Sequence, residues 1–119
     1  GPNYDTANIA HCETALNRAG LSPSIMVDCS HANSSKNHTN QPLVTRDIGR
    51  QIQEGNSSIV GIMLESHLNE GRQDIPDDLT QLQYGVSVTD ACMNWEATET
   101  ALRELAHTVR AVLPQRHSA

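Results

Sequence analysis

Three residues of this sequence have the chemistry to hold a divalent metal ion together: His31, Glu65 and Asp90. An imidazole nitrogen and two carboxylate oxygens suit zinc or another first-row divalent ion. His31 and Glu65 each follow a short apolar run, whereas Asp90 follows the stretch 85–89 inside a long polar segment. The spacing forms no compact signature such as HxxxH or CxxC, so it does not single out a metal site by itself.

Each of these residues also has an ordinary structural interpretation. His31 could be a hydrogen-bonded loop residue, and Glu65 could be solvated or paired with Arg or Lys. Asp90 could cap a helical turn that begins just after it. Cys29 could share the side of His31 in a strand, but a buried free cysteine usually acts as a small hydrophobic residue. His67 is expected to contact the rim of such a site rather than coordinate a metal.

The elements that must position these residues follow from the hydrophobic pattern. Apolar residues recur at helical spacing in three segments, and Gly or Pro stands where each segment should end. The last of these segments carries Leu102, Leu105, Val109 and Val112 on one stripe. Helices are therefore predicted from Asp5 or Thr6 to about Ala19, from Pro42 to Gly55, and from about Asn94 to Pro114.

Two continuous apolar runs, 24–30 and 58–64, are predicted to be short strands. Such runs are typical of strands covered on both faces, as in a parallel sheet. The helix between them makes a βαβ unit, which would place His31 and Glu65 at neighbouring carboxyl ends. The polar run 31–36 is predicted to lie outside the core. The long loop 66–94 is predicted to be a lid or binding loop, or else disordered.

The predicted fold class is α/β, and two strands with three helices are a poor closed unit. Each strand would keep an unpaired edge and only partial cover. A piece of a larger parallel sheet fits better, and a (β/α)8 barrel is the natural candidate. Catalytic residues of such barrels cluster at the carboxyl ends of the strands. We therefore expect residues 1–119 to be the C-terminal segment of one barrel domain, with about its last two strands and three helices.

Composition excludes several classes of function. The formal net charge is −6 and the Lys and Arg residues are scattered, which argues against nucleic-acid binding. No apolar run approaches the roughly 18 residues that span a membrane. The three cysteines lie far apart and imply no disulfide framework, so a reducing, cytoplasmic location is expected.

Several stretches carry a more specific signal than any single residue. They are MVDCSHANSSK at 26–36, GIMLESHL at 61–68 followed by Glu70 and Gly71, and YGVSVTDAC at 84–92 followed by Trp95 and Glu96. In these stretches the chain resembles the class I 3-deoxy-D-arabino-heptulosonate-7-phosphate (DAHP) synthases. Residues 1–5 also resemble the segment after the sixth barrel strand of that family. The resemblance covers essentially the whole chain in order.

The resemblance implies a metal-dependent (β/α)8 enzyme of the shikimate pathway. These enzymes condense phosphoenolpyruvate with erythrose 4-phosphate, and their metal is held by Cys, His, Glu and Asp. His31, Glu65 and Asp90 match the last three ligands and are the implied catalytic residues, with Asp90 also facing the substrate. The Cys ligand belongs to the first strand, which this chain lacks. Cys29 departs from the aromatic residue expected there, and the metal could be Mn, Fe, Co or Zn.

The resemblance also implies partners for the chain. These are the two substrates, the remainder of the synthase chain and, in the parent, further copies in a homo-oligomer. Alone, the chain is expected to be inactive, because the phosphate-binding Arg and Lys residues come mostly from earlier strands. Two other interpretations stay open: a non-catalytic folding or interaction module, and an unrelated small α/β metal-binding domain.

Overall fold

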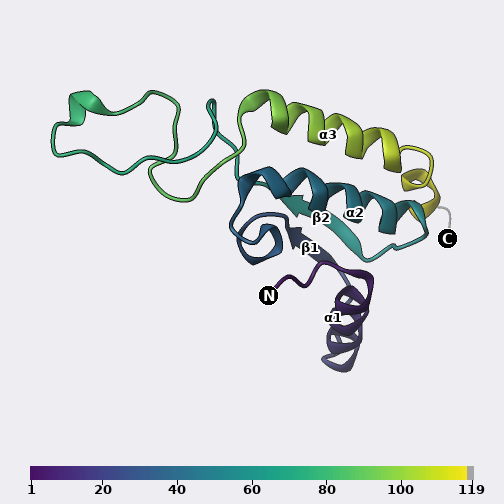
Figure 1. Cartoon of the computed structure of the whole chain (residues 1–119). Helices are drawn as coiled ribbons and strands as arrows, with labels where there is room; N and C mark the ends of the chain where they lie inside the picture. Colours follow the sequence, from purple (N-terminus) through teal and green to yellow (C-terminus); the bar gives the residue numbers. More distant parts are fainter. Residues whose placement is uncertain (118–119) are drawn as a thin grey trace.

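The computed structural model describes residues 1–117 as an α/β arrangement, which confirms the predicted class (Figure 1). The chain alternates helices and strands before a long loop leads into the last helix. Short 3₁₀ turns lie between these elements and at the C-terminal end. The main elements are α1 (Thr6–Arg18), β1 (Ile25–Asp28), α2 (Gln41–Gln53), β2 (Ile59–Met63) and α3 (Trp95–Val109).

The two strands pair in parallel, as predicted from the βαβ pattern. Ile25 lies opposite Ile59 and Asp28 opposite Met63, with an irregularity after Ile25. The helix α2 forms the crossover between the strands. The carboxyl ends of parallel strands lie at the same edge of a sheet, so the residues that follow β1 and β2 emerge side by side.

Helices cover only one face of this sheet within the described part of the chain. On the covered face Val27 and Ile59 are buried against Ile48 of α2. On the other face Met26 is 67% exposed and Val60 is 62% exposed. This exposed face agrees with the expectation that two strands and three helices give only partial cover, because the three helices bring no second layer against Met26 and Val60.

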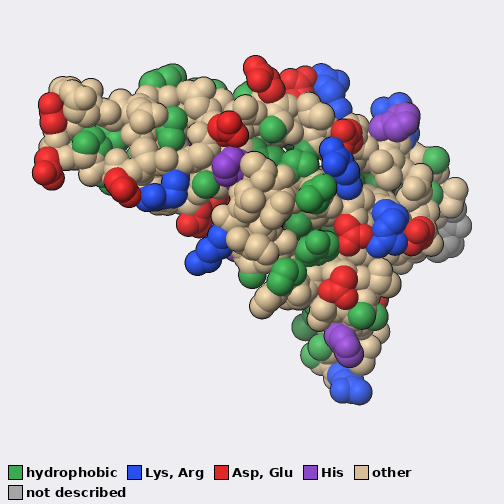
Figure 2. Space-filling view, in the orientation of Figure 1, with side chains coloured by type: hydrophobic (Ala, Val, Ile, Leu, Met, Phe, Trp, Pro, Cys, Tyr) green, Lys and Arg blue, Asp and Glu red, His purple; other side chains and the backbone are tan. Residues whose placement is uncertain are grey.

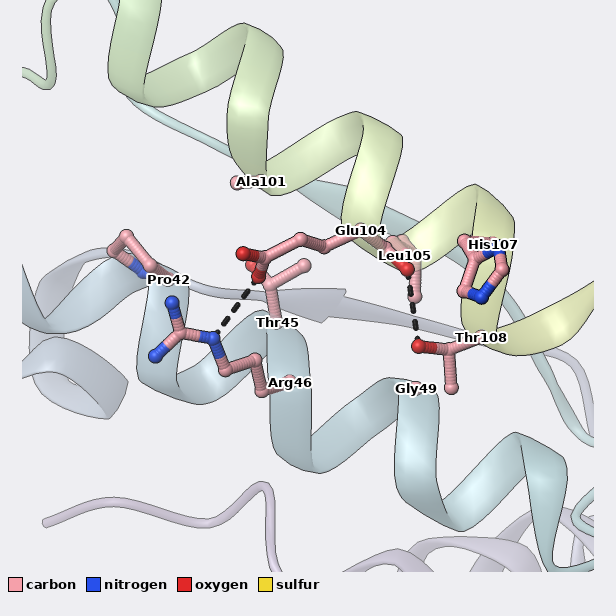
Figure 3. A pocket seen from close by; sticks show the side chains of 9 residues that line it. All are labelled: Pro42, Thr45, Arg46, Gly49, Ala101, Glu104, Leu105, His107 and Thr108. Atoms are coloured by element: carbon pink, nitrogen blue, oxygen red, sulfur yellow. Dashed lines mark hydrogen bonds and ion pairs between the residues drawn. The ribbon is translucent and has the colours of Figure 1, made fainter.

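The helices α2 and α3 lie side by side along the covered face (Figure 1). Gly49 allows their close approach, since a Cβ atom there would come within 3.2 Å of Leu105 Cδ1. Toward the start of α2 the helices leave a cavity of about 350 Å³. Arg46 and Glu104 meet across it at 3.0 Å (Figure 3). The lining residues include none of the three candidate ligands, so this cavity is separate from their site.

The predicted starts of the first and last helices are confirmed, and one predicted helix end is wrong. The side chain of Asp5 accepts the Asn8 N–H at the start of α1, and that of Asn94 accepts the Ala97 N–H at the start of α3. The last helix ends at Val109, several residues before Pro114. A proline has no N–H and clashes with the carbonyl four residues back, so the backbone tightens into a 3₁₀ turn there.

The long loop 64–94 extends away from the helices as an arm (Figure 1). The described chain measures 57 × 31 × 18 Å with a radius of gyration of 16.8 Å. A compact domain of this length would have a radius of roughly 13.5 Å. The arm has internal order, because it contains a 3₁₀ turn at Leu79–Gln81 and backbone pairing between its outgoing and returning halves.

The surface carries its charges without a basic patch on the face in view. Figure 2 shows acidic side chains on both the arm and the helical body, while Lys and Arg are scattered between them. That distribution agrees with a formal net charge of −6. Among residues 1–117, no helix combines the length and apolar character needed to cross a membrane.

Candidate metal centre

The structure brings His31, Glu65 and Asp90 together at the carboxyl edge of the sheet. One ligand atom from each residue lies within 4.8 Å of the other two. His31 Nε2 is 2.7 Å from Glu65 Oε1 and 3.3 Å from Asp90 Oδ2. The Glu65 side chain is 17% exposed, whereas that of Asp90 is 66% exposed. The centre is therefore anchored on the Glu65 side and open to solvent on the Asp90 side.

His31 is oriented by Asp28, the last residue of β1. Asp28 Oδ2 lies 2.8 Å from His31 Nδ1, and Asp28 Oδ1 accepts the backbone N–H of Ser30 at 2.8 Å. The Asp28 carbonyl also accepts the side-chain N–H of Asn33. With its proton held on Nδ1, a neutral His31 offers the lone pair of Nε2 to the centre. The sequence alone does not identify this partner, although an Asp three residues before the His is a signal that points to it.

The backbone after β1 turns sharply to place this imidazole. His31 has a φ of 40°, in a region that residues with side chains seldom occupy. It begins a 3₁₀ turn that ends at Ser34, whose side chain donates to the His31 carbonyl at 3.2 Å. Ser34 is 1% exposed, so the prediction that 31–36 lies outside the core is wrong for this residue. Its hydroxyl is accommodated because it is hydrogen-bonded.

Hydrogen bonds to its backbone N–H and carbonyl hold Glu65 in place. Its N–H donates to Gln41 Oε1 at 2.9 Å, and its carbonyl accepts from Gln41 Nε2 at 3.0 Å. The same carbonyl accepts the N–H of Met93 at 3.0 Å. Glu65 thus lies where α2, the end of β2 and the returning arm meet. The sequence also does not predict that Gln41 binds the Glu65 backbone, since a glutamine at the start of a helix belongs to no recognisable motif.

Asp90 reaches the centre because the arm folds back on itself. Gly71 and Cys92 exchange two backbone hydrogen bonds, at 2.9 and 3.1 Å. Arg72 Nε donates to the Thr89 carbonyl at 2.9 Å. Cys92 is buried, and burial raises the pKa of its thiol, which lies 3.5 Å from the Asp90 carbonyl. The returning strand of the arm is therefore fixed on both sides of Asp90.

The ordinary interpretations of the neighbouring residues are now resolved. Asn94, not Asp90, caps the helix that follows. Cys29 is fully buried in the hydrophobic core, as expected of a small apolar residue. His67 is exposed and its Nδ1 accepts the Leu68 N–H, which leaves it outside the cluster.

The donor set fits a divalent cation. A neutral imidazole and two carboxylates supply three ligands, and the exposed side of the centre leaves room for a fourth ligand. The carboxylates also stabilise a proton on the imidazole. The hydrogen bond that His31 donates to Asp28 raises the pKa of His31 above its ordinary 6.5, and the charges of Glu65, Asp28 and Asp90 act in the same direction, against partial desolvation.

Metal binding is therefore expected to depend on pH. A cation must displace the proton from Nε2, so affinity falls as pH falls through the raised pKa of His31, by up to about tenfold per pH unit for one proton. Calorimetric Mn²⁺ titrations across a pH series measure this, and NMR of the metal-free chain gives the pKa directly. Asp28→Asn should lower that pKa; an unchanged His31 titration in this variant would contradict the assigned cause.

Comparisons with known proteins all point to one family. The profile of the DAHP synthetase I family matches residues 1–103. The chain is 56% identical over 114 residues to the tyrosine-inhibited phospho-2-dehydro-3-deoxyheptonate aldolase of Schizosaccharomyces pombe. It is 47% identical over 115 residues to the Tyr-sensitive phospho-2-dehydro-3-deoxyheptonate aldolase of Escherichia coli strain K12. These matches cover 93% and 97% of this chain, but 31% and 32% of those relatives.

A solved structure agrees with the sequence matches. The phospho-2-dehydro-3-deoxyheptonate aldolase of Francisella tularensis superimposes with a TM-score of 0.87 at 41% identity. The match covers 92% of this chain and 31% of that one. The chain thus spans about a third of the length of these three relatives.

Proposed function

This chain belongs to the DAHP synthetase I family, and from that premise we propose that it is the C-terminal segment of a DAHP synthase barrel. Residues 1–119 supply about the last two strands and three helices of one (β/α)8 domain. The parallel pairing of β1 with β2 supports this placement, because parallel strands joined by helices build such barrels. The exposed Met26 and Val60 would then face the barrel interior.

The proposed activity of the assembled protein is the first step of the shikimate pathway. Phosphoenolpyruvate and erythrose 4-phosphate condense to DAHP: the enol carbon forms a bond to the aldehyde carbon, water adds to the phosphate-bearing carbon, and inorganic phosphate leaves. The observation that carries this proposal is the clustering of His31, Glu65 and Asp90 within 4.8 Å at the carboxyl edge of the sheet. Barrel enzymes place their catalytic groups at that edge.

The three clustered residues are proposed as metal ligands, for Mn, Fe, Co or Zn. A bound cation of this kind polarises an oxygen as a Lewis acid or lowers the pKa of a water. Asp28 keeps the proton on Nδ1 of His31, so Nε2 stays available as a ligand. Glu65 supplies charge in the less exposed part of the centre. Asp90, at 66% exposure, is placed to contact the sugar-phosphate hydroxyls as well.

The proposed partners are the two substrates and the remainder of the synthase chain, with a cytoplasmic homo-oligomer as the parent. Membership of the family argues against an unrelated α/β metal-binding domain. A folding or interaction module within the same family is the remaining alternative. Activity separates the two, because a module would support assembly without contributing ligands.

A chimera tests the proposal. In it this chain replaces the matching segment of the S. pombe relative, which is 56% identical to it. We expect phosphate release that requires both substrates and is lost on chelation of the metal, since His31, Glu65 and Asp90 would complete the centre. The unaltered relative serves as the positive control. A chimera that assembles to the relative's native mass yet releases no phosphate with added Mn²⁺ would favour the non-catalytic module.

A further inference from the structure

Gln41 pairs its side chain with the backbone of a candidate metal ligand on another element. It lies at the first position of α2 and is fully buried. Its Oε1 accepts the Glu65 N–H at 2.9 Å and its Nε2 donates to the Glu65 carbonyl at 3.0 Å. The amide thereby makes the same two bonds that a neighbouring strand would make.

Glu65 needs such a partner because strand pairing ends before it. The last pair in the sheet joins Asp28 to Met63, and Cys29 donates to the Met63 carbonyl just beyond. After that point β1 gives way to the 3₁₀ turn that starts at His31, so it offers no backbone groups opposite Glu65. Gln41 takes the place of the missing strand for one residue.

We propose that Gln41 is a positioning residue that fixes Glu65 at the metal centre through these two hydrogen bonds. The metal-binding part of this inference rests on the proposed function. A fixed Glu65 backbone limits where its carboxylate can lie, and that carboxylate is 2.7 Å from His31 Nε2. An amide side chain carries an acceptor oxygen and a donor nitrogen side by side, which are the two groups that these bonds use.

The same helix contains a matched control. Gln51 is also buried, at 4% exposure, and its Nε2 donates to the Tyr4 carbonyl at 2.8 Å. It therefore resembles Gln41 in residue type, burial and helix, but it contacts the N-terminal segment instead of the centre. Replacing either glutamine by methionine keeps the length of the side chain and removes its polar atoms.

The first measurement is amide hydrogen exchange at Glu65, by NMR of the metal-free chain. Gln41→Met is expected to speed exchange of the Glu65 N–H by about five- to tenfold, the effect of losing one ordinary hydrogen bond. Gln51→Met should leave that rate unchanged. Gln41→Glu is a second variant, because its carboxylate still accepts from the N–H but cannot donate to the carbonyl. Unchanged Glu65 exchange in Gln41→Met would overturn the proposal.

The second measurement is Mn²⁺ affinity by calorimetry on the same proteins. Both Gln41 variants should bind Mn²⁺ about 10–100-fold more weakly, as is usual when a partner of a metal ligand is altered. Gln51→Met should bind as the unaltered chain does, and equal weakening in Gln41→Met and Gln51→Met would overturn the proposal as a general loss of stability. An unaltered chain that binds no Mn²⁺ would contradict the proposed function instead, and the exchange rates would still decide whether Gln41 fixes Glu65.

Discussion

Replacing His31 by alanine in the chimera is expected to abolish condensation activity and to weaken Mn²⁺ binding by more than ~100-fold. The loss should exceed the roughly 10–100-fold effect of altering a partner outside the ligand set, because here a ligand itself is removed. The imidazole also lies at the centre of the cluster, with its Nε2 within 3.3 Å of both carboxylates. Without it, the two carboxylates would face each other across the space it leaves.

The experiment compares turnover and metal content in the same preparations. His11→Ala is the control, because His11 is an exposed residue of α1 outside the cluster. It should retain both activity and metal. If His31→Ala kept near-normal turnover with a full complement of metal, His31 would have to be removed from the proposed ligands.

The local elements were predictable from sequence because their signals are local. The Asp5 and Asn94 caps lie directly before their helices, and each side chain accepts a backbone N–H three residues ahead. The apolar runs indicated two parallel strands, and the βαβ pattern then placed His31 and Glu65 at neighbouring carboxyl ends. That much of the candidate site follows from topology alone.

The remaining features depend on contacts between segments distant in sequence. Asp90 reaches the centre only because Gly71 and Cys92 pair within the arm, and no local pattern encodes that pairing. Gln41 meets Glu65 across 24 residues. Partial cover of the strands was expected, but the sequence does not show that Met26 and Val60 are the residues left exposed, since a continuous apolar run is the same whichever face a second layer covers.

The second large effect concerns the 119-residue chain by itself, which we expect to form no detectable DAHP even with Mn²⁺ present. Both proposed substrates carry phosphate, and binding phosphate takes positioned Arg or Lys side chains. In this chain Arg46, Arg50, Arg72 and Arg103 are instead paired with carboxylates on the helices and the arm. The centre itself gathers the carboxylates of Asp28, Glu65 and Asp90, whose three formal negative charges exceed the two positive charges of a bound Mn²⁺, so it does not by itself attract anionic substrates.

The measurement is DAHP formation by the chain alone and after mixing with a separately produced piece of the S. pombe relative that precedes the matched segment. Activity that appears only in the mixture would support assembly of one barrel from two pieces, with the open face at Met26 and Val60 covered by the added strands. Activity in the chain alone would mean that its own residues bind both phosphates. That result would contradict the proposal that this segment supplies metal ligands while earlier strands bind the phosphates of the substrates.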